Sequence, residues 1–202
     1  MLIQIRGTSG SGKSWVSQKL FTWCQERFDY HEYWEHTASG RLRTRPSEYL
    51  FGKRIYFCGQ HETPCSGVDN NGASNPRIYE NYLLPRGTKH PSWIFLCEGL
   101  LFSEDVKWTT RFIEETGSPV VVYYLSTPRE VCLEQLMRRK ESGRGSKDYE
   151  RIDMKLTKRI ETINRTKARL EDVEHVTINE VTALQAYLQI RWILKHQTGM
   201  FK

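Results

Sequence analysis

The run Gly7-Thr8-Ser9-Gly10-Ser11-Gly12-Lys13-Ser14, with the spacing G-x-x-x-x-G-K-S, constrains this chain more than any other feature. It follows an apolar segment at 2–5 and precedes a stretch at 14–27 that is typical of a helix. Glycines allow the tight turn that points successive backbone N–H groups at a polyphosphate, and the following helix presents its positive end to the same anion. The motif therefore predicts a nucleoside triphosphate site.

Two residues of the run have separate chemical roles in such a site. Lys13 can reach the β- and γ-phosphates, and the Ser14 hydroxyl is placed to ligate Mg²⁺. We therefore expect ATP and Mg²⁺ to bind together. The expected nucleotide contacts comprise the whole loop: Gly7, Thr8, Ser9, Gly10, Ser11, Gly12, Lys13 and Ser14.

Bulk composition predicts one folded domain over residues 1–202. The chain is 38% hydrophobic and 27% charged, as in a soluble globular protein. No apolar run approaches the ~20 residues that cross a bilayer. Because the glycine loop begins after only six residues, we expect no signal peptide and a cytoplasmic location. The five cysteines form no C-x-x-C pair, which favours reduced, buried thiols over a zinc site.

Alternating strand-like and helix-like segments predict an α/β fold, in which a parallel sheet is covered by helices on both faces in three layers. The polar segment that runs to about Pro46 carries no predicted strand. The predicted strands are 2–6, 54–58, 93–97, 120–125 and 176–178, and the predicted helices are 14–27, 77–84, 106–116, 128–140, 148–170 and 182–195.

Ligands of such sheets bind beyond the carboxyl ends of the strands. Glu98 ends the apolar run 93–97, a pattern that places a carboxylate beside the Mg²⁺ of a nucleotide. Asp69 and Glu62 lie in the long loop after the second predicted strand, and either could act as general base toward a substrate hydroxyl. Asp is also common in turns for conformational reasons, so both interpretations of Asp69 stay open.

A basic, glycine-bearing segment predicts a lid at about 138–150. Arg138 and Arg139 end a predicted helix, and Arg144 lies between two glycines. These arginines could close over the triphosphate and stabilise the transferring phosphoryl group. Arg159 on the next helix is a weaker phosphate or adenine candidate.

Positive charge and aromatic side chains suggest an anionic partner. The formal net charge is +6, and the run 41–45 contributes three arginines. That run is either a solvated basic face or a contact for a nucleic acid backbone. Side chains outside the predicted strands are candidates for substrate contact: Tyr30, His31, Tyr33, Trp34 and His36. By contrast, we expect Trp93, Tyr123 and Trp192 in the core.

Two further segments carry a family resemblance. The loop 59–69, GQHETPCSGVD, followed by Glu98-Gly99-Leu100-Leu101, resembles the G-x-Y-x-T-x-C-G-G-x-D and F-E-G-L-L motifs of bacteriophage 5-hydroxymethyluracil DNA kinases. The resemblance extends from Met1 to about Leu170. It departs from the pattern where His61 replaces Tyr, Ser66 replaces Gly and Pro64 shifts the spacing.

The resemblance implies an ATP-dependent P-loop kinase that phosphorylates the hydroxymethyl group of a modified base in DNA. Asp69 would be the base or the ligand of that group, and His61 or Trp34 would pack against a target base that leaves the stack. Three alternatives stay open: a kinase for a free nucleotide or small molecule, a polynucleotide 5′-hydroxyl kinase, and a nucleotide-dependent switch. The sequence predicts no oligomeric state.

Overall fold

The computed structural model describes residues 1–34, 46, 48–59, 61, 75–141 and 149–197. The strands are β1 (Leu2–Arg6), β2 (Tyr30–Tyr33), β3 (Glu48–Phe51), β4 (Ile55–Cys58), β5 (Ile94–Glu98), β6 (Val120–Leu125) and β7 (Val176–Val181). The helices are α1 (Lys13–Gln25), α2 (Asn75–Ile78), the π-helical turn η2 (Tyr79–Leu83), α3 (Leu84–Lys89), α4 (Leu100–Ser103), α5 (Lys107–Thr116), α6 (Arg129–Glu141), α7 (Tyr149–Glu171) and α8 (Ala183–Gln197).

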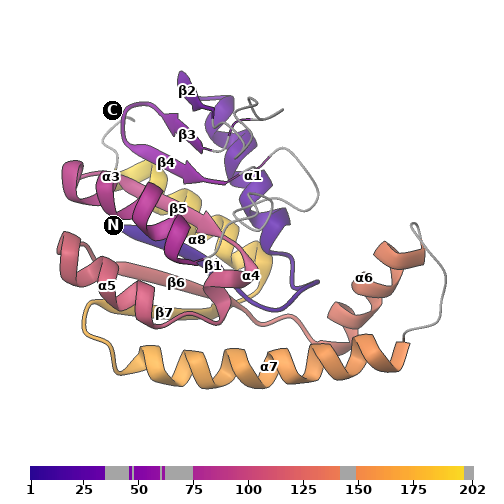
Figure 1. Ribbon diagram of the computed structural model, residues 1–202. Helices are drawn as coiled ribbons and strands as arrows, with labels where there is room; N and C mark the ends of the chain where they lie inside the picture. Colours follow the sequence, from indigo (N-terminus) through magenta and orange to yellow (C-terminus); the bar gives the residue numbers. More distant parts are fainter. Residues whose placement is uncertain (35–45, 47, 60, 62–74, 142–148, 198–202) are drawn as a thin grey trace, which may run out of the picture.

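One sheet of seven strands organises the described chain, in the order β2-β3-β4-β5-β1-β6-β7 (Figure 1). The five strands from β4 to β7 in this order are all parallel. They are rich in β-branched and aromatic residues, which suit a sheet buried on both faces. The predicted parallel sheet is thus confirmed, with β1 at its centre and the glycine loop at its carboxyl edge.

Helices cover both faces of the sheet and complete three layers (Figure 1). On one face α1 and α8 pack together over a core that contains Ile3 and Ile5. On the other face η2, α3 and α5 pack over a core that contains Leu2 and Phe95. Because side chains alternate along a strand, Gln4 and Arg6 of β1 point to the same face as Leu2. The three-layer α/β prediction is confirmed.

The edge of the sheet departs from the prediction. Strands β2 and β3 pair antiparallel with each other, and β3 pairs antiparallel with β4. We expected Tyr30, His31 and Tyr33 to lie outside the sheet, and this expectation is wrong, because they form edge strand β2. Each strand has only four residues, so neither carries enough alternation to be recognised from the sequence.

Of the three residues predicted to lie in the core, Trp93 and Tyr123 contribute to it and Trp192 does not. Tyr123 is buried, Trp93 packs against the core, and Trp192 is 59% exposed on α8. Helix α8 instead turns Ala186, Ile190 and Leu194 toward the sheet. Four cysteines are free and buried (Cys24, Cys58, Cys97 and Cys132), and Cys65 lies outside the described residues.

Helices α6 and α7 extend beyond the carboxyl edge of the sheet (Figure 1). They share a small hydrophobic cluster of their own, centred on Cys132, Leu133, Ile152 and Leu156. The predicted lid at 138–150 includes the ends of these two helices, and residues 142–148 lie outside the described part. None of the helices that the structure describes is both long and apolar enough to cross a membrane.

Candidate active site

The glycine loop joins the end of β1 to the start of α1. Gly10 and Gly12 have φ values of +82° and +97°, a region that L side chains rarely adopt. A Cβ added at Gly10 would lie 2.6 Å from the carbonyl oxygen of Cys132. Glycine is therefore required at position 10 both for the turn and for the close approach of α6.

Three neighbouring elements hold the loop in place. The Ser103 hydroxyl accepts a hydrogen bond from the Gly7 N–H at 3.0 Å and lies 3.1 Å from the Gly7 carbonyl oxygen. Thr127, which follows β6, donates to the carbonyl oxygen of Ser11 at 2.8 Å. The Thr8 hydroxyl contacts the Cys132 sulfur at 3.4 Å. These contacts fix the backbone before any ligand binds, which lowers the entropic cost of binding.

Two polar groups inside the loop suit an anionic ligand. The Lys13 ammonium is buried and donates to the carbonyl oxygens of Gly7 and Thr8, at 3.0 and 2.7 Å. Among the described residues, the buried Ser11 Oγ finds no hydrogen-bond partner. A buried hydroxyl without a partner is costly, so it is expected to bind a group from outside the chain. The loop therefore has the donors that a polyphosphate requires.

The predicted metal ligands lie next to each other. Ser14, at the start of α1, donates a hydrogen bond to Glu98 Oε1 at 3.1 Å. Glu98 is the last residue of β5, where β5 runs beside β1, and it is buried. A hydroxyl and a carboxylate beside the end of the glycine loop offer the oxygen ligands that Mg²⁺ prefers.

A buried polar network lies directly beneath the loop. Arg6, fully buried at the end of β1, donates to Gln4 Oε1 and to the Thr109 hydroxyl at 2.7 Å. It also donates to the backbone carbonyl of Asp105 at 2.6 Å. The Tyr79 hydroxyl of η2 accepts a hydrogen bond from Gln4 at 2.7 Å, so the network also reaches the helical segment α2–η2. This arrangement ties the position of Gly7 to two helices on the same face.

Of the cations that we expected over the triphosphate, Arg138 and Arg139 lie on α6, and Arg159, the weaker candidate, lies on α7. Arg159 and Lys155 line a pocket of about 220 Å³ together with Ser9 of the glycine loop, and Arg159 donates to Glu104 at 2.7 Å. Arg138 is largely exposed and pairs with Glu134 on its own helix at 2.6 Å. Arg139 is exposed one residue further on, and Arg144 lies outside the described residues.

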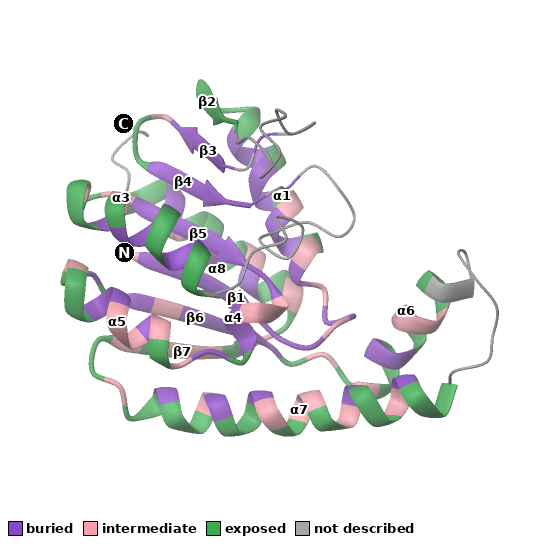
Figure 2. Cartoon of the chain, viewed as in Figure 1, coloured by how far each residue is buried: buried purple, intermediate pink, exposed green. Residues whose placement is uncertain are grey.

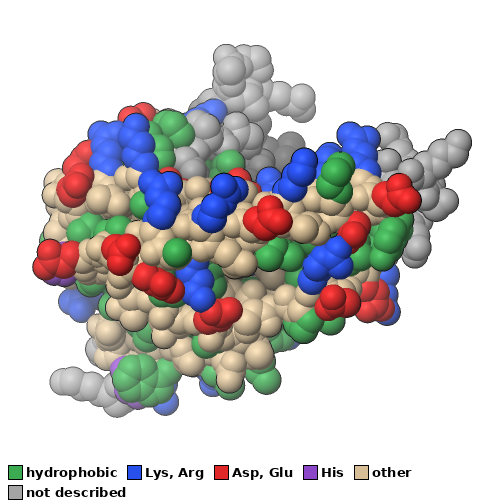
Figure 3. Space-filling model, turned by 90° about the horizontal axis from the view of Figure 1, so that it is seen from below, with side chains coloured by type: hydrophobic (Ala, Val, Ile, Leu, Met, Phe, Trp, Pro, Cys, Tyr) green, Lys and Arg blue, Asp and Glu red, His purple; other side chains and the backbone are tan. Residues whose placement is uncertain are grey.

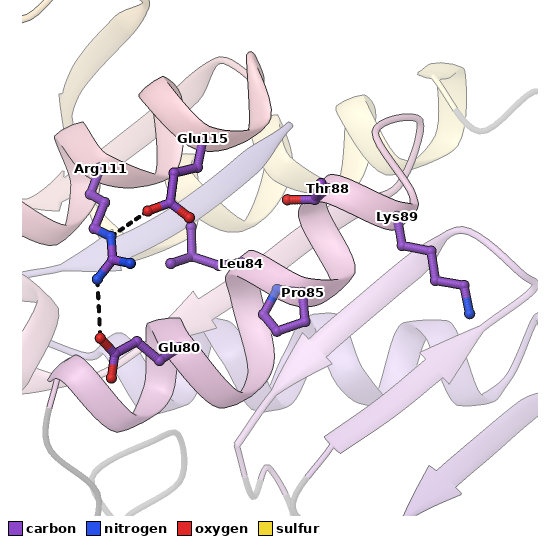
Figure 4. A pocket seen from close by; sticks show the side chains of 7 residues that line it. All are labelled: Glu80, Leu84, Pro85, Thr88, Lys89, Arg111 and Glu115. Atoms are coloured by element: carbon purple, nitrogen blue, oxygen red, sulfur yellow. Dashed lines mark hydrogen bonds and ion pairs between the residues drawn. The ribbon is translucent and has the colours of Figure 1, made fainter.

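A second pocket has no relation to the glycine loop. It has a volume of about 590 Å³ and lies between the η2–α3 segment and α5, near the amino-terminal ends of the strands. Its Arg111 is paired with both Glu80 and Glu115, as Figure 4 shows. Both carboxylates neutralise the Arg111 guanidinium, and Lys89 is the other cation that lines this pocket.

Comparison with known proteins identifies the family. A curated relative described as "5-hmdU DNA kinase", from Pseudomonas phage PaMx11, is 33% identical over 143 residues, which are 69% of this chain and 69% of the relative. The chain belongs to this kinase family. It is therefore a phosphotransferase, and its glycine loop has the sequence of the phosphate-binding loop of P-loop kinases. No protein-family model matches the chain.

Two solved structures show weaker likeness to the kinase. A gluconokinase from Sinorhizobium meliloti 1021 has a TM-score of 0.43 at 14% identity, covering 97% of this chain and 96% of its own. A deoxyadenosine kinase from M. mycoides with bound dCTP has a TM-score of 0.38 at 16% identity, covering 96% of this chain and 99% of its own. At such low scores neither structure bears on the substrate of this kinase.

His61 has a different place in the kinase from the one we expected. It is 1% exposed, its Nδ1 shares a hydrogen bond with the Ser17 hydroxyl of α1, and its Nε2 lies 3.2 Å from the Cys58 carbonyl oxygen. Its ring also stacks on Phe21. Burial lowers the pKa of His61 to about 4, so the ring is neutral near pH 7. The expectation that His61 packs against a target base is wrong, because this side chain is enclosed in the core.

Other residues predicted for the acceptor side are only partly described. Trp34 is exposed directly after β2, while Asp69, Glu62 and the run 41–45 lie outside the described residues. Nothing in the sequence indicated that Ser103, Cys132 and Arg6 surround the glycine loop. Their partners are distant in the chain, so no local pattern could reveal them.

Proposed function

We propose that this kinase transfers the γ-phosphate of ATP to the hydroxymethyl group of 5-hydroxymethyluracil in DNA. The choice of this acceptor is supported chiefly by the similarity to the phage relative described as a 5-hmdU DNA kinase. The resemblance of the motif at 59–69 to that of 5-hydroxymethyluracil DNA kinases supports the same acceptor. We assign the kinase to the cytoplasm, which is the host cytoplasm if this kinase, like its relative, is encoded by a phage.

On this proposal, the glycine loop binds the triphosphate. Its backbone N–H groups and the Ser11 hydroxyl hold the phosphate oxygens, and Lys13 exchanges its loop carbonyl partners for the β- and γ-phosphates. Ser14 and Glu98 would hold Mg²⁺, and the bound ion would supply positive charge beside the transferring phosphoryl group.

The acceptor is activated from the loop after β4. Asp69 accepts the proton of the hydroxymethyl group while the acceptor oxygen forms its bond to the γ-phosphorus. The bond from that phosphorus to the β–γ bridging oxygen breaks, and ADP leaves. Arg138, Arg139 and Arg144 approach from the lid and stabilise the phosphoryl oxygens in the transition state. A modified base within a duplex must leave the stack to reach this position.

The test uses ATP labelled on its γ-phosphate and three acceptors of equal concentration. They are DNA that contains 5-hydroxymethyluracil, ordinary DNA with free 5′-hydroxyl ends, and free nucleotides. We expect label at internal positions of the modified DNA only. Label at 5′ ends would identify a polynucleotide kinase instead, and label on free nucleotides would identify a nucleotide kinase.

Two variants separate the acceptor step from nucleotide binding. Asp69→Asn is expected to abolish transfer to the modified DNA while ATP still binds, since the amide cannot accept the proton. Lys13→Met is expected to abolish transfer to every acceptor. Lys19→Met is the matched control, because Lys19 is exposed on the same helix as Lys13. Undiminished transfer by Asp69→Asn would remove Asp69 from the mechanism.

A further inference from the structure

The tip of the glycine loop faces helix α7 across a cavity of about 220 Å³, which we call the Ser9 cavity. The residues that line it are Ser9, Leu136, Ile152, Lys155, Leu156 and Arg159. The four that belong to α7 are spaced so that they share one face of the helix. Figure 2 shows buried positions recurring along α7 between exposed ones, and Ile152 and Leu156 are two of them. The packing that buries these two side chains therefore turns Lys155 and Arg159 toward the glycine loop.

The Arg159 guanidinium is anchored at one side only. Its Nε donates to Glu104 Oε1 at 2.7 Å, and among the described residues its two Nη groups have no hydrogen-bond partner. By contrast, the Arg129 guanidinium of α6 has its Nη2 occupied by Asp153 and Thr157. A guanidinium that is held through Nε keeps its plane fixed, while both Nη groups stay available for a two-point contact with an oxyanion.

Glu104, which anchors Arg159, is itself placed beside the glycine loop. It directly follows α4, and the last residue of that helix, Ser103, contacts both the N–H and the carbonyl oxygen of Gly7. The proposed Mg²⁺ ligand Glu98 lies just before the other end of the same short helix. Arg159 therefore approaches the loop from the side of the proposed metal site.

Lys155 is a second cation at the Ser9 cavity. It is exposed, and within the described part of the chain it makes no hydrogen bond or ion pair. Lys155 and Arg159 are four residues apart on one helix, a spacing at which like charges repel each other. No carboxylate is among the described residues that line the cavity. An anion bound there would relieve this repulsion and use the available donors of both side chains.

The surroundings of the cavity select a compact anionic group rather than an extended polyanion. Figure 3 shows the face that contains α7, where Lys and Arg side chains are interspersed with Asp and Glu, so positive charge is not continuous along this face. The volume of about 220 Å³ is below the roughly 300–1,000 Å³ of pockets that enclose whole small molecules. The cavity therefore suits one charged group of a larger ligand, and the loop that contributes Ser9 is the one expected to bind a polyphosphate.

We propose that Arg159 and Lys155 bind the γ-phosphate of ATP in the Ser9 cavity, and that Glu104 is the positioning residue of Arg159. The metal ion of P-loop kinases contacts the β- and γ-phosphates, and of these two only the γ-phosphate is terminal and free to project from the loop. The inference rests on the proposed function in taking ATP as the donor, and the identity of the acceptor does not enter it. Because ADP has no γ-phosphate, the contact distinguishes ATP from ADP.

The test measures nucleotide affinity in the presence of Mg²⁺ and in the absence of any acceptor. The two ligands are ADP and the non-hydrolysable β,γ-imido analogue of ATP, and isothermal titration calorimetry gives Kd for each. Arg159→Met and Lys155→Met remove the two cations. Lys158→Met and Glu161→Ala are the matched controls, because both side chains are exposed on α7 and neither lines the Ser9 cavity. Thermal unfolding of each variant establishes that it folds.

We expect Arg159→Met and Lys155→Met each to weaken binding of the imido analogue about tenfold, because each loses a charge-assisted contact with the γ-phosphate. The Kd for ADP is expected to stay unchanged, as are both constants of the two controls. The inference is overturned if both variants bind the analogue normally, if their affinity for ADP falls by the same factor, or if Lys158→Met weakens the analogue equally.

Two variants of Glu104 test its positioning role. Glu104→Ala and Glu104→Gln both remove the negative charge, but only the glutamine keeps an oxygen that can accept the hydrogen bond from Arg159 Nε. We expect Glu104→Ala to bind the analogue about fivefold more weakly than Glu104→Gln. This difference should vanish when Arg159→Met is combined with each variant, since the side chain that Glu104 positions is then gone. Equal affinities of the two single variants, or a difference that persists in the combined ones, would exclude the positioning role.

Failure of the proposed function gives a different result. Transfer of phosphate to an acceptor other than the modified base would refute that function but leave every nucleotide constant above as expected, because no acceptor takes part in the binding measurements. Conversely, a wild-type kinase that phosphorylates modified DNA but shows no dependence on Arg159 and Lys155 for binding the analogue would overturn this inference alone.

Discussion

The Ser14 hydroxyl donates a 3.1 Å hydrogen bond to the Glu98 carboxylate, although 84 residues separate the two in the chain. The contact forms because β5 lies parallel to β1, so the carboxyl ends of both strands meet beside the glycine loop. It brings the two proposed Mg²⁺ ligands of this kinase within one hydrogen bond of each other. The arrangement is rigid, because Glu98 is buried and Ser14 begins a helix.

Substitution of Glu98 tests the proposed metal site. Glu98→Gln keeps the size of the side chain and a hydrogen-bond acceptor for Ser14 but removes the negative charge. We expect kcat to fall about 10- to 100-fold and the Mg²⁺ concentration for half-maximal rate to rise. Steady-state rates over a Mg²⁺ titration measure both effects. Glu115→Gln, on the exposed surface of α5, is the control, and an unchanged Mg²⁺ requirement in Glu98→Gln would contradict the assignment.

Substitution of Gly10 tests the close approach of the loop to α6. Gly10→Ala would place a Cβ 2.6 Å from the Cys132 carbonyl oxygen at a φ of +82°, so the loop must shift. We expect a loss of about 3 kcal/mol in the free energy of unfolding, together with much weaker ATP binding. Chemical denaturation and nucleotide titration measure the two quantities.

Gly117→Ala is the matched control for Gly10→Ala. Gly117 ends α5 with a φ of +63°, and an added Cβ there would meet nothing within 4 Å. The free energy of unfolding of Gly117→Ala should therefore fall only by the conformational strain, about 1–2 kcal/mol, and ATP binding should stay normal. Equal loss of stability and of ATP binding in the two variants would show that contact with Cys132 is unimportant.

His61 should make stability depend on pH. Burial lowers the pKa of His61 to about 4, below the ~6.5 of an unfolded chain, so the unfolded state binds a proton first as pH falls. The free energy of unfolding is therefore expected to fall by about 3 kcal/mol between pH 6.5 and 4, and to be insensitive to this group above pH 6.5. Urea unfolding at several pH values measures the slope.

A comparison of variants assigns this slope to His61. His61→Gln cannot titrate, so its stability should vary less between pH 6.5 and 4 than that of the wild-type kinase. His31→Gln, which changes an exposed histidine on β2, should leave the wild-type slope intact. If His61→Gln and the wild type share one slope, the imidazole does not carry the pH dependence.

The hydrogen bonds of Arg6 should stabilise the fold and the position of the adjacent glycine loop. Arg6→Met fills part of the volume but leaves Gln4 Oε1 and the Asp105 carbonyl without their charged donor. We expect a loss of about 3–5 kcal/mol in the free energy of unfolding and a raised KM for ATP. Arg111→Met also removes an arginine with two partners, but on the exposed surface, where little change is expected. Wild-type stability in Arg6→Met would exclude a structural role for this network.

The sequence by itself determined the nucleotide loop and the parallel sheet. The eight residues from Gly7 to Ser14 are contiguous, so their backbone geometry follows from their own conformational preferences. The runs 93–97 and 120–125 are continuous and apolar, which is the pattern of a strand buried on both faces of a parallel sheet. Glu98 could be placed near the loop because the carboxyl ends of parallel strands share one edge.

Only the tertiary structure decided the edge of the sheet and the environments of single side chains. Strands β2 and β3 exist because they pair with each other and with β4, and four residues contain too little pattern to predict that pairing. The sequence did not reveal that His61 is enclosed by α1 or that Trp192 is exposed on α8. Such outcomes depend on contacts between segments far apart in the chain, which local pattern and propensity do not encode.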